Sequence, residues 1–211
     1  MNQKKLWKIE SLWDQKTDPD FSYTFDFSES TEYVFSDDYG EYKGLKFPVQ
    51  MIEKNGKNIY LFDNHNMMLE VLFTEYSKKQ SPLHIVHIDA HNDDALFPVE
   101  KPTSFTYEDL QYLISTTRIS DFFDALSETK VIHSISRITT SSSFKEYEDR
   151  NYDVLSLDID IFGEEGEFID LEAKVEVIKK AWKSSQVIAI AMSPGFINQS
   201  YAKEIIQIMI R

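Results

Sequence analysis

The feature that most limits the fold of this chain is the alternation of short apolar runs with helix-like stretches from Leu61 onward. The apolar runs span residues 83–88, 131–135, 154–159 and 187–192, and the helical patterns span residues 107–115, 121–126, 144–149, 171–183 and 202–210. Continuous apolar strands separated by helices are typical of a mostly parallel sheet with both faces covered. We therefore predict one α/β domain over residues 1–211, with three α/β/α layers.

The N-terminal part differs in character, and we expect residues 1–60 to form a β-rich acidic extension of a core at 61–211. Residues 17–41 contain eight acids and no Lys or Arg. Within them Phe21, Tyr23, Phe25 and Phe27 alternate with polar residues, which predicts a half-buried strand of a β ribbon. Such a ribbon can dock a basic peptide by strand addition, or it can be a solvated hairpin. A second hairpin is predicted at 47–51 and 58–62, around an Asn-Gly turn.

The composition excludes several classes of function. The chain has 36 Asp and Glu against 22 Lys and Arg, a net charge of −14. Such a surface repels phosphate backbones and anionic lipids, so nucleic-acid and membrane partners are not expected. The absence of cysteine rules out disulfides and thiolate metal sites. With no secretory signal and no long apolar run, we expect a soluble, cytoplasmic protein.

Two predicted strands end in residues that suit a metal site. Asp89-Ala90-His91-Asn92-Asp93 closes one strand, and Asp158-Ile159-Asp160 closes another. Residues i and i+2 of a strand point the same way, which predicts that Asp89 converges with His91 and Asp158 with Asp160.

Crowded carboxylates raise one another's pKa unless a cation joins them. Carboxylate and imidazole ligands without sulfur favour Mn²⁺, and less specifically Zn²⁺ or Fe²⁺. His65, which follows the strand predicted at 58–62, is a further candidate ligand.

These motifs resemble those of the ureohydrolase superfamily, which includes arginases and agmatinases. The segment from Asp89 to Asp93 is similar to its D-A-H-x-D motif, and the segment from Ser156 to Asp160 to its S-x-D-x-D motif. The short length and the sequence around His65 most resemble compact peptide arginases, which convert arginine to ornithine in ribosomally made peptides. The resemblance covers residues 61–197.

The resemblance implies a binuclear Mn²⁺ site, with Asp93 also counted as catalytic. One ion would bind His65, Asp89, Asp93 and Asp158, and the other Asp89, His91, Asp158 and Asp160. Two such ions lie about 3.5–4 Å apart and provide hydroxide at neutral pH. The hydroxide would attack the guanidinium carbon of a peptide arginine, releasing urea.

The chain departs from arginases in three places. Gly163 follows Phe162 where arginases continue with Asp and Pro. Residues 189–196 lack the acid that binds the substrate guanidinium in arginases. The candidate replacements are Glu164, Glu165, Glu167 and Asp94, and the alternative is that these acids form a solvated loop.

The third departure concerns the histidines. His133 is a candidate proton shuttle for the leaving amine, or else a packed structural histidine. His87, which shares a strand face with Asp89, is expected to support the ligands without binding metal, and His84 is expected to be structural.

Three other functions remain possible from the sequence. A metallophosphoesterase also uses D-x-H and Asn-His motifs, but in the reverse order, with more histidines downstream. A single-zinc deacylase related to arginase needs neither His65, Asp93 nor Asp160. A non-catalytic, metal-containing module for a ribosomal-peptide precursor is compatible with the missing guanidinium acid. The favoured hypothesis is a Mn²⁺-dependent hydrolase acting on arginine in a peptide or protein, and a homo-oligomer is possible.

Overall fold

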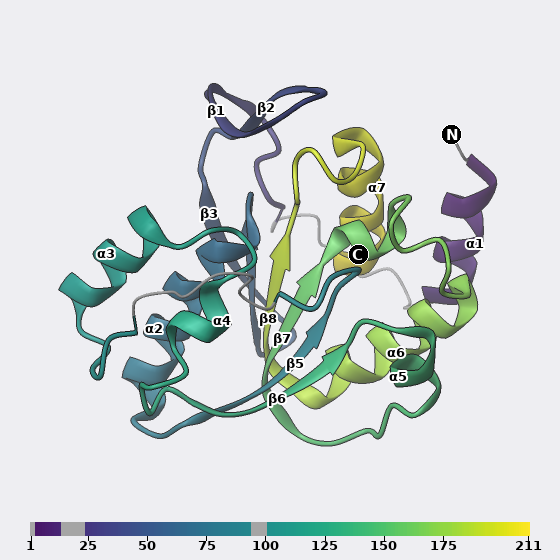
Figure 1. Ribbon diagram of the computed structural model, residues 1–211. Coiled ribbons are helices and arrows are strands. Elements are labelled where there is room, and N and C mark those ends of the chain that lie inside the picture. Colours follow the sequence, from purple (N-terminus) through teal and green to yellow (C-terminus); the bar gives the residue numbers. More distant parts are fainter. Residues whose placement is uncertain (1–2, 14–23, 94–100) are drawn as a thin grey trace.

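The computed structural model describes residues 3–13, 24–93 and 101–211, which form an α/β fold around a six-stranded sheet (Figure 1). The strand order across the sheet is β3-β4-β8-β7-β5-β6. The parallel strands are β4 (Lys57–Phe62), β8 (Ser185–Ala191), β7 (Tyr152–Asp158), β5 (Leu83–Ile88) and β6 (Ile132–Ile138). At one edge β3 (Val49–Lys54) pairs antiparallel with β4. The prediction of a mostly parallel sheet is confirmed.

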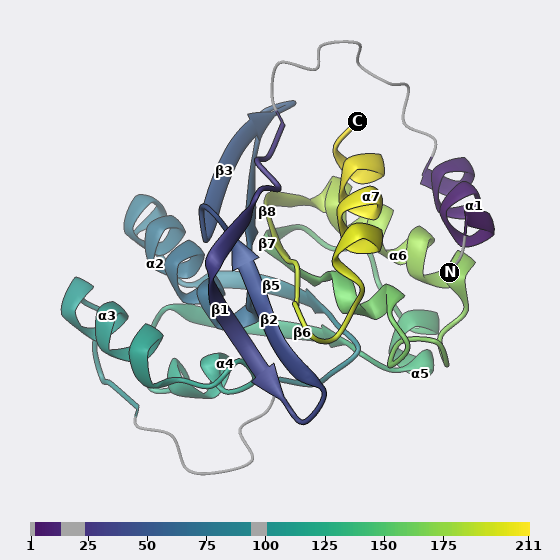
Figure 2. The same cartoon turned by 90° about the horizontal axis from the view of Figure 1, so that it is seen from above.

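Helices cover both faces of this sheet (Figures 1 and 2). One face carries α2 (Met68–Lys79), α3 (Tyr107–Thr116) and α4 (Phe122–Ala125), and the other carries α1 (Gln3–Trp13), α5 (Ser141–Lys145), α6 (Leu171–Ser184) and α7 (Gln199–Ile210). Each face has its own apolar core, with Phe62, Leu72 and Phe122 in the first. In the second, the rings of Trp13 and Trp182 meet edge to face at 5.6 Å. The three-layer arrangement follows from apolar residues on both sides of each central strand.

Most predicted elements are present with shifted ends. The strands predicted at 83–88, 131–135, 154–159 and 187–192 correspond to β5, β6, β7 and β8. The Asn-Gly hairpin is confirmed, because Asn55 (φ 53°) and Gly56 (φ 72°) both have the positive φ of a type I′ turn. The helix predicted at 144–149 is wrong in position, since the capping box of Thr140 and Ser143 starts α5 at Ser141. Helices α1 and α2 were not predicted.

The acidic ribbon lies further along the chain than predicted. Residues 24–28 form no strand, and Phe25 is instead buried in the core, while Phe21 and Tyr23 fall outside the described residues. The antiparallel ribbon consists of β1 (Glu29–Asp37) and β2 (Gly40–Leu45). It stands over the carboxyl ends of the parallel strands, as Figures 1 and 2 show from two directions.

The ribbon is attached to the core through specific contacts. The backbone N–H of Leu45 donates to Asp63 Oδ1 at 2.7 Å, and Asn64 Nδ2 donates to the carbonyl of Val34 at 2.8 Å. The ring of Phe35 packs on Phe196 with centroids 5.0 Å apart. A Cβ at position 195 would collide with that ring, and Gly195 also has a φ of +98°, so both observations require glycine there.

The predicted boundary between an extension at 1–60 and a core at 61–211 falls inside β4, which belongs to the central sheet. Within the described ranges, every helix is too short or too polar to cross a lipid bilayer.

The topology identifies one preferred position for a ligand. The neighbouring strands β5 and β7 are followed by helices on opposite faces of the sheet, α3 and α4 after β5 and α6 after β7. Chain connections that diverge in this way leave a crevice at the carboxyl ends of the two strands. Asp89 and Asp158 lie at this point.

Candidate metal centre

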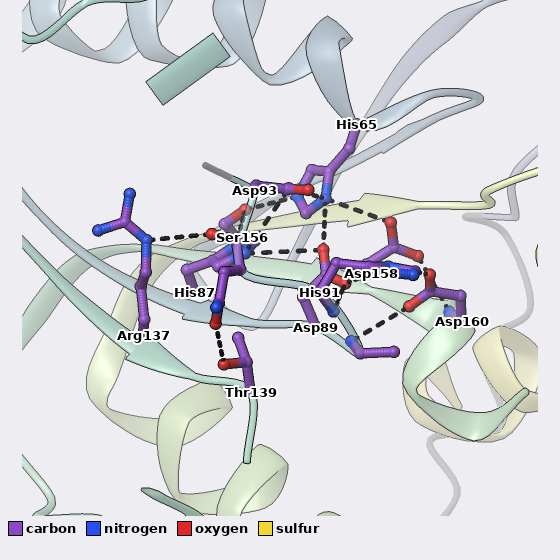
Figure 3. Close-up of polar contacts among 12 residues, drawn as sticks. His65, His87, Asp89, His91, Asp93, Arg137, Thr139, Ser156, Asp158 and Asp160 are labelled. Atoms are coloured by element: carbon purple, nitrogen blue, oxygen red, sulfur yellow. Dashed lines mark hydrogen bonds and ion pairs between the residues drawn. The ribbon is translucent and has the colours of Figure 1, made fainter. Parts of the chain in front are cut away.

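Loops and turns after three parallel strands bring the predicted ligands together (Figure 3). His65 opens the 3₁₀ helix η1 (His65–Met67) after β4, and the loop from Asp89 to Asp93 follows β5. Asp158 ends β7, and Asp160 lies in the 3₁₀ helix η2 (Ile159–Phe162). Two overlapping groups of side chains here can hold a cation: His65, His87, Asp89 and Asp93, and next to them Asp89, His91 and Asp160.

The inner group surrounds the buried ring of His65. Its Nδ1 lies 2.9 Å from Asp89 Oδ2, 3.1 Å from Asp93 Oδ2 and 3.2 Å from Asp158 Oδ2. All four side chains are at most 6% exposed. Three carboxylate oxygens that meet one imidazole nitrogen in an enclosed site form a donor set for a divalent ion.

The outer group surrounds His91, which is more accessible. His91 Nδ1 lies 3.2 Å from Asp89 Oδ1 and 3.1 Å from Asp160 Oδ2, and its side chain is 39% exposed. Asp89 therefore directs one carboxylate oxygen to each group. A carboxylate shared in this way can bridge two cations.

Asp89 converges with His91, and Asp158 with Asp160, as predicted. The reason given for this, that residues i and i+2 of one strand point the same way, is wrong. β5 ends at Ile88 and β7 at Asp158, so neither pair lies within one strand. Each aspartate instead turns the backbone: Asp89 Oδ1 accepts the N–H of His91 at 2.7 Å, and Asp158 Oδ1 accepts that of Asp160 at 3.0 Å. A side chain bonded to the backbone two residues ahead forms a tight turn, which brings residue i+2 back toward residue i.

The loop that carries Asp93 is fixed by the end of β6. Arg137 Nε donates to the carbonyl of Asn92 at 3.1 Å, and Thr139 Oγ1 donates to Asn92 Oδ1 at 2.6 Å. Asp93 itself has a φ of 52°, which is unfavourable for a residue with a Cβ. These bonds stabilise the strained backbone that turns the Asp93 carboxylate toward His65.

The electrostatics of the cluster favour a cation. Burial lowers the pKa of His65, but Asp93, Asp158 and Asp89 outweigh it and hold the pKa well above its usual 6.5. Hydrogen bonds to Asp160 and Asp89 raise the pKa of His91 to about 11. Burial and the neighbouring aspartates raise the pKa of Asp160. Protons thus offset the carboxylate charge when no metal is bound, and divalent ions can displace them.

Unpaired buried atoms also fit a cation. Within residues 24–93 and 101–211, His87 Nε2 is buried and makes no hydrogen bond, and Asp93 Oδ2 makes none either, although it lies 3.1 Å from His65 Nδ1. Buried polar atoms are normally satisfied, so an unmade bond at a carboxylate and at an imidazole points to an ion. The donor set therefore fits a metal ion. This supports the prediction that a group of His and Asp side chains could hold one.

The other candidate residues have different positions. His133 is exposed near the start of β6, where its ring lies against that of His84 with centroids 4.3 Å apart and planes inclined at 51°. The cluster lies at the other end of this strand, after Ile138, so the structure contradicts a proton-shuttle role for His133. It is not a packed core histidine either, and His84 is exposed as well.

Of the three predicted glutamates, Glu165 reaches the site, where its carboxylate contacts His91 Nε2. Glu164 is exposed, and Glu167 pairs with Lys5 at 2.6 Å. Asp94 lies outside the described residues. A carboxylate bonded to the far nitrogen of a metal-binding histidine orients the ring and increases its basicity, which is the role that Glu165 fits.

A pocket of about 490 Å³ opens beside the cluster. Asp93, Asp158 and Asp160 line its polar side, and its apolar walls are Phe35 from the ribbon, Ile119 and Phe196. Arg118 also lines it. The pocket combines polar candidate ligands, apolar walls and the cationic side chain of Arg118, as small-molecule and side-chain sites do.

Lys174 supports the turn that carries Asp160. Its buried ammonium donates to the carbonyl of Ile161 at 2.7 Å. We expect Lys174→Met to loosen this turn and weaken the outer metal position about tenfold, with the inner one changed less than about threefold. Calorimetric metal titration measures both affinities. Lys179→Met is the control, because its ammonium also donates to a backbone carbonyl, that of Leu12, at 2.7 Å. Equal weakening in both variants would contradict this role.

The same substitution has a pH signature. Burial lowers the pKa of Lys174 to about 8 from its ordinary 10.5. Between these values the unfolded lysine binds more protons than the folded one, so this group makes wild-type stability rise with pH through that window. Lys174→Met should lack this rise in denaturant unfolding measured between pH 8 and 10.5.

No protein-family model, curated protein or solved structure matches this chain. The chemistry of the cluster and its pocket is therefore the basis for assigning a function.

Proposed function

We propose that this protein is a metal-dependent hydrolase of the ureohydrolase type, which binds two divalent ions, preferably Mn²⁺, and converts arginine in a peptide or protein to ornithine and urea. The observation that carries the proposal is Asp89, whose two carboxylate oxygens face two separate groups of ligands at the carboxyl ends of the strands. A single-metal site has no need for this arrangement.

The side chains at this centre would bind two separate ions. His65, Asp89, Asp93 and Asp158 would hold the inner ion, and His91 with Asp89, Asp158 and Asp160 the outer one. Two bound divalent ions supply hydroxide at neutral pH by lowering the pKa of water. Ser193 Oγ donates to Asp158 Oδ2 at 2.5 Å and fixes that carboxylate.

The pocket supports an arginine side chain as the reacting group. Phe35 and Phe196 can pack on its methylene groups while the guanidinium lies toward the aspartates. Arg118 lines the same pocket, so the panel of substrates includes peptides that carry a carboxylate beside the arginine, either a C-terminal one or that of an acidic neighbour. Glu165 contacts His91 through Oε2, so its other oxygen, Oε1, is the candidate partner of the guanidinium among the residues that the structure describes.

The test is urea release from a panel of arginine compounds by the Mn²⁺-loaded protein. The panel contains peptides with internal arginine, with Arg-Glu, with C-terminal arginine as acid or amide, and free arginine and agmatine. We expect urea and the matching mass loss from at least one peptide, and none with Asp158→Asn. A protein that binds two ions but leaves every compound intact would contradict the proposal.

The contribution of the ribbon to the pocket can be tested through Phe35. Phe35→Ala should raise KM for the preferred peptide about tenfold and leave kcat within about threefold, because it removes an apolar wall of the pocket without changing a candidate metal ligand. Tyr33→Ala is the control, since Tyr33 lies on the same strand but is 57% exposed. Urea release against peptide concentration gives both constants. A large fall in kcat with unchanged KM would contradict the assigned role.

A metal-dependent deacylase is the second candidate. The apolar walls formed by Phe35, Ile119 and Phe196 also suit an acyl-lysine, and that substrate needs no guanidinium acid. Acetyl-lysine and longer acyl-lysine peptides in the same assay distinguish the two reactions. If none of these compounds reacts, the alternative of a non-catalytic peptide-binding module gains support.

A further inference from the structure

His87 occupies an unusual position for a histidine. It lies in the central strand β5, opposite Ser156 of β7 in the sheet register, and is fully buried. Its ring lies against Phe123 and His65, each with centroids 5.1 Å away. An apolar residue would fill this place at lower cost, because burying a ring nitrogen that makes no hydrogen bond is unfavourable.

One nitrogen of this ring is directed at the inner group. His87 Nε2 lies 3.6 Å from both Asp89 Oδ2 and Asp93 Oδ2, and makes no hydrogen bond to any residue that the structure describes. These separations are too long for hydrogen bonds. They suit ligands of one ion, since two atoms about 2.1 Å from a shared metal lie about 3.0–3.6 Å apart at ligand–metal–ligand angles of about 90–120°.

The other nitrogen faces Ser156, which also contacts His65. The hydroxyl of Ser156 lies 3.3 Å from His87 Nδ1 and 2.8 Å from His65 Nε2. A hydroxyl oxygen has two lone pairs and can accept a hydrogen bond from both rings. That arrangement places a proton on His65 Nε2 and on His87 Nδ1. It leaves His65 Nδ1 and His87 Nε2, the two nitrogens facing Asp89, free to bind metal.

We propose that His87 Nε2 is a direct ligand of the inner ion, with Ser156 setting the tautomers of both inner histidines. This inference rests on the metal centre of the proposed function but not on its reaction. The inner position then has two imidazoles and the outer position one. More nitrogen ligands favour Zn²⁺ and Fe²⁺ over Mn²⁺, so the two positions differ in metal preference as well as in exposure.

The first test uses the wild-type protein. Histidine-selective ¹⁵N labelling reports which ring nitrogens bind metal when Zn²⁺ is added. We expect the first equivalent of Zn²⁺ to shift His65 Nδ1 and His87 Nε2, with protons kept on the nitrogens facing Ser156. If His87 keeps an unbound Nε2 after two equivalents, the inference is wrong, whether or not the protein releases urea.

The second test compares His87→Gln with His84→Gln, a control on the same strand whose ring lies against His133. In calorimetric titration with Zn²⁺, His87→Gln should weaken the tighter position at least about 100-fold and leave the weaker one within about threefold. His84→Gln should match the wild type. A folded His87→Gln protein with unchanged affinity at both positions would overturn the inference. If the wild type binds Zn²⁺ through His87 as expected but releases no urea from any peptide, the result counts against the proposed reaction alone.

Discussion

Replacing Asp89 by Asn is expected to lower urea release at least about 1,000-fold and to remove most divalent-ion binding at both positions. Asp89 Oδ2 belongs to the inner group and Oδ1 to the outer group, 2.9 Å from His65 Nδ1 and 3.2 Å from His91 Nδ1. An amide keeps the size and the turn at residue 89 but removes the negative charge that both ions need. Calorimetric titration with Mn²⁺ and the urea assay measure the two effects.

Asp149→Asn is the matched control, because Asp149 is exposed and outside the cluster. It should bind Mn²⁺ and release urea as the wild type does. If Asp89→Asn still bound two ions with wild-type affinity, Asp89 would not be shared between two metals. The division of the cluster into inner and outer positions would then be wrong.

Removing metal is expected to lower the melting temperature by about 10–20 °C. An ion present at 100 times its Kd stabilises a folded protein by about 2.7 kcal/mol per site, and about 1 kcal/mol shifts the Tm of a chain of this size by about 2–4 °C. The effect should be large here because Asp89, Asp93, Asp158 and Asp160 are all buried together. Melting with and without EDTA, followed by added Mn²⁺, measures it.

The pH dependence of this stabilisation follows from the same groups. His65 and His91 have raised pKa values, and both must lose a proton to bind an ion, so the stabilisation should weaken as the pH falls. Asp89→Asn should melt at the same temperature with and without EDTA. A wild-type Tm that EDTA leaves unchanged at every pH would show that the carboxylates are stable without a cation.

The parallel core could be predicted from the sequence because its strands are apolar on both faces, a pattern that few other structures produce. The ribbon was misplaced for a physical reason. Alternating aromatics predict a strand with one buried face, but Phe25 is buried in the core without strand pairing. β1 and β2 lack a comparable alternation. They are held in place instead by the packing of Phe35 and by hydrogen bonds to Asp63 and Asn64. These contacts come from parts of the chain whose proximity the sequence does not display.

The candidate metal ligands could be predicted because Asp and His motifs follow two apolar strands, where buried carboxylates and imidazoles must be paired or bound to metal. The ligand role proposed for His87 could not be predicted, because its register against Ser156 and the unpaired state of its Nε2 depend on the packing of β5 and β7. The role suggested for His133 failed because strand direction places it at the other end of β6. The contact between Glu165 and His91 depends on how the loop after η2 folds back, which local pattern does not reveal.

The number of divalent ions bound per chain tests the central claim most directly. The purified protein, stripped of metal and then dialysed against Mn²⁺, can be analysed by elemental mass spectrometry together with calorimetric titration. The shared carboxylate of Asp89 predicts two ions per chain with distinguishable affinities, the tighter one in the buried inner position. Fewer than one bound ion per chain, with Mn²⁺ or with Zn²⁺, would contradict the metal centre and every function proposed from it.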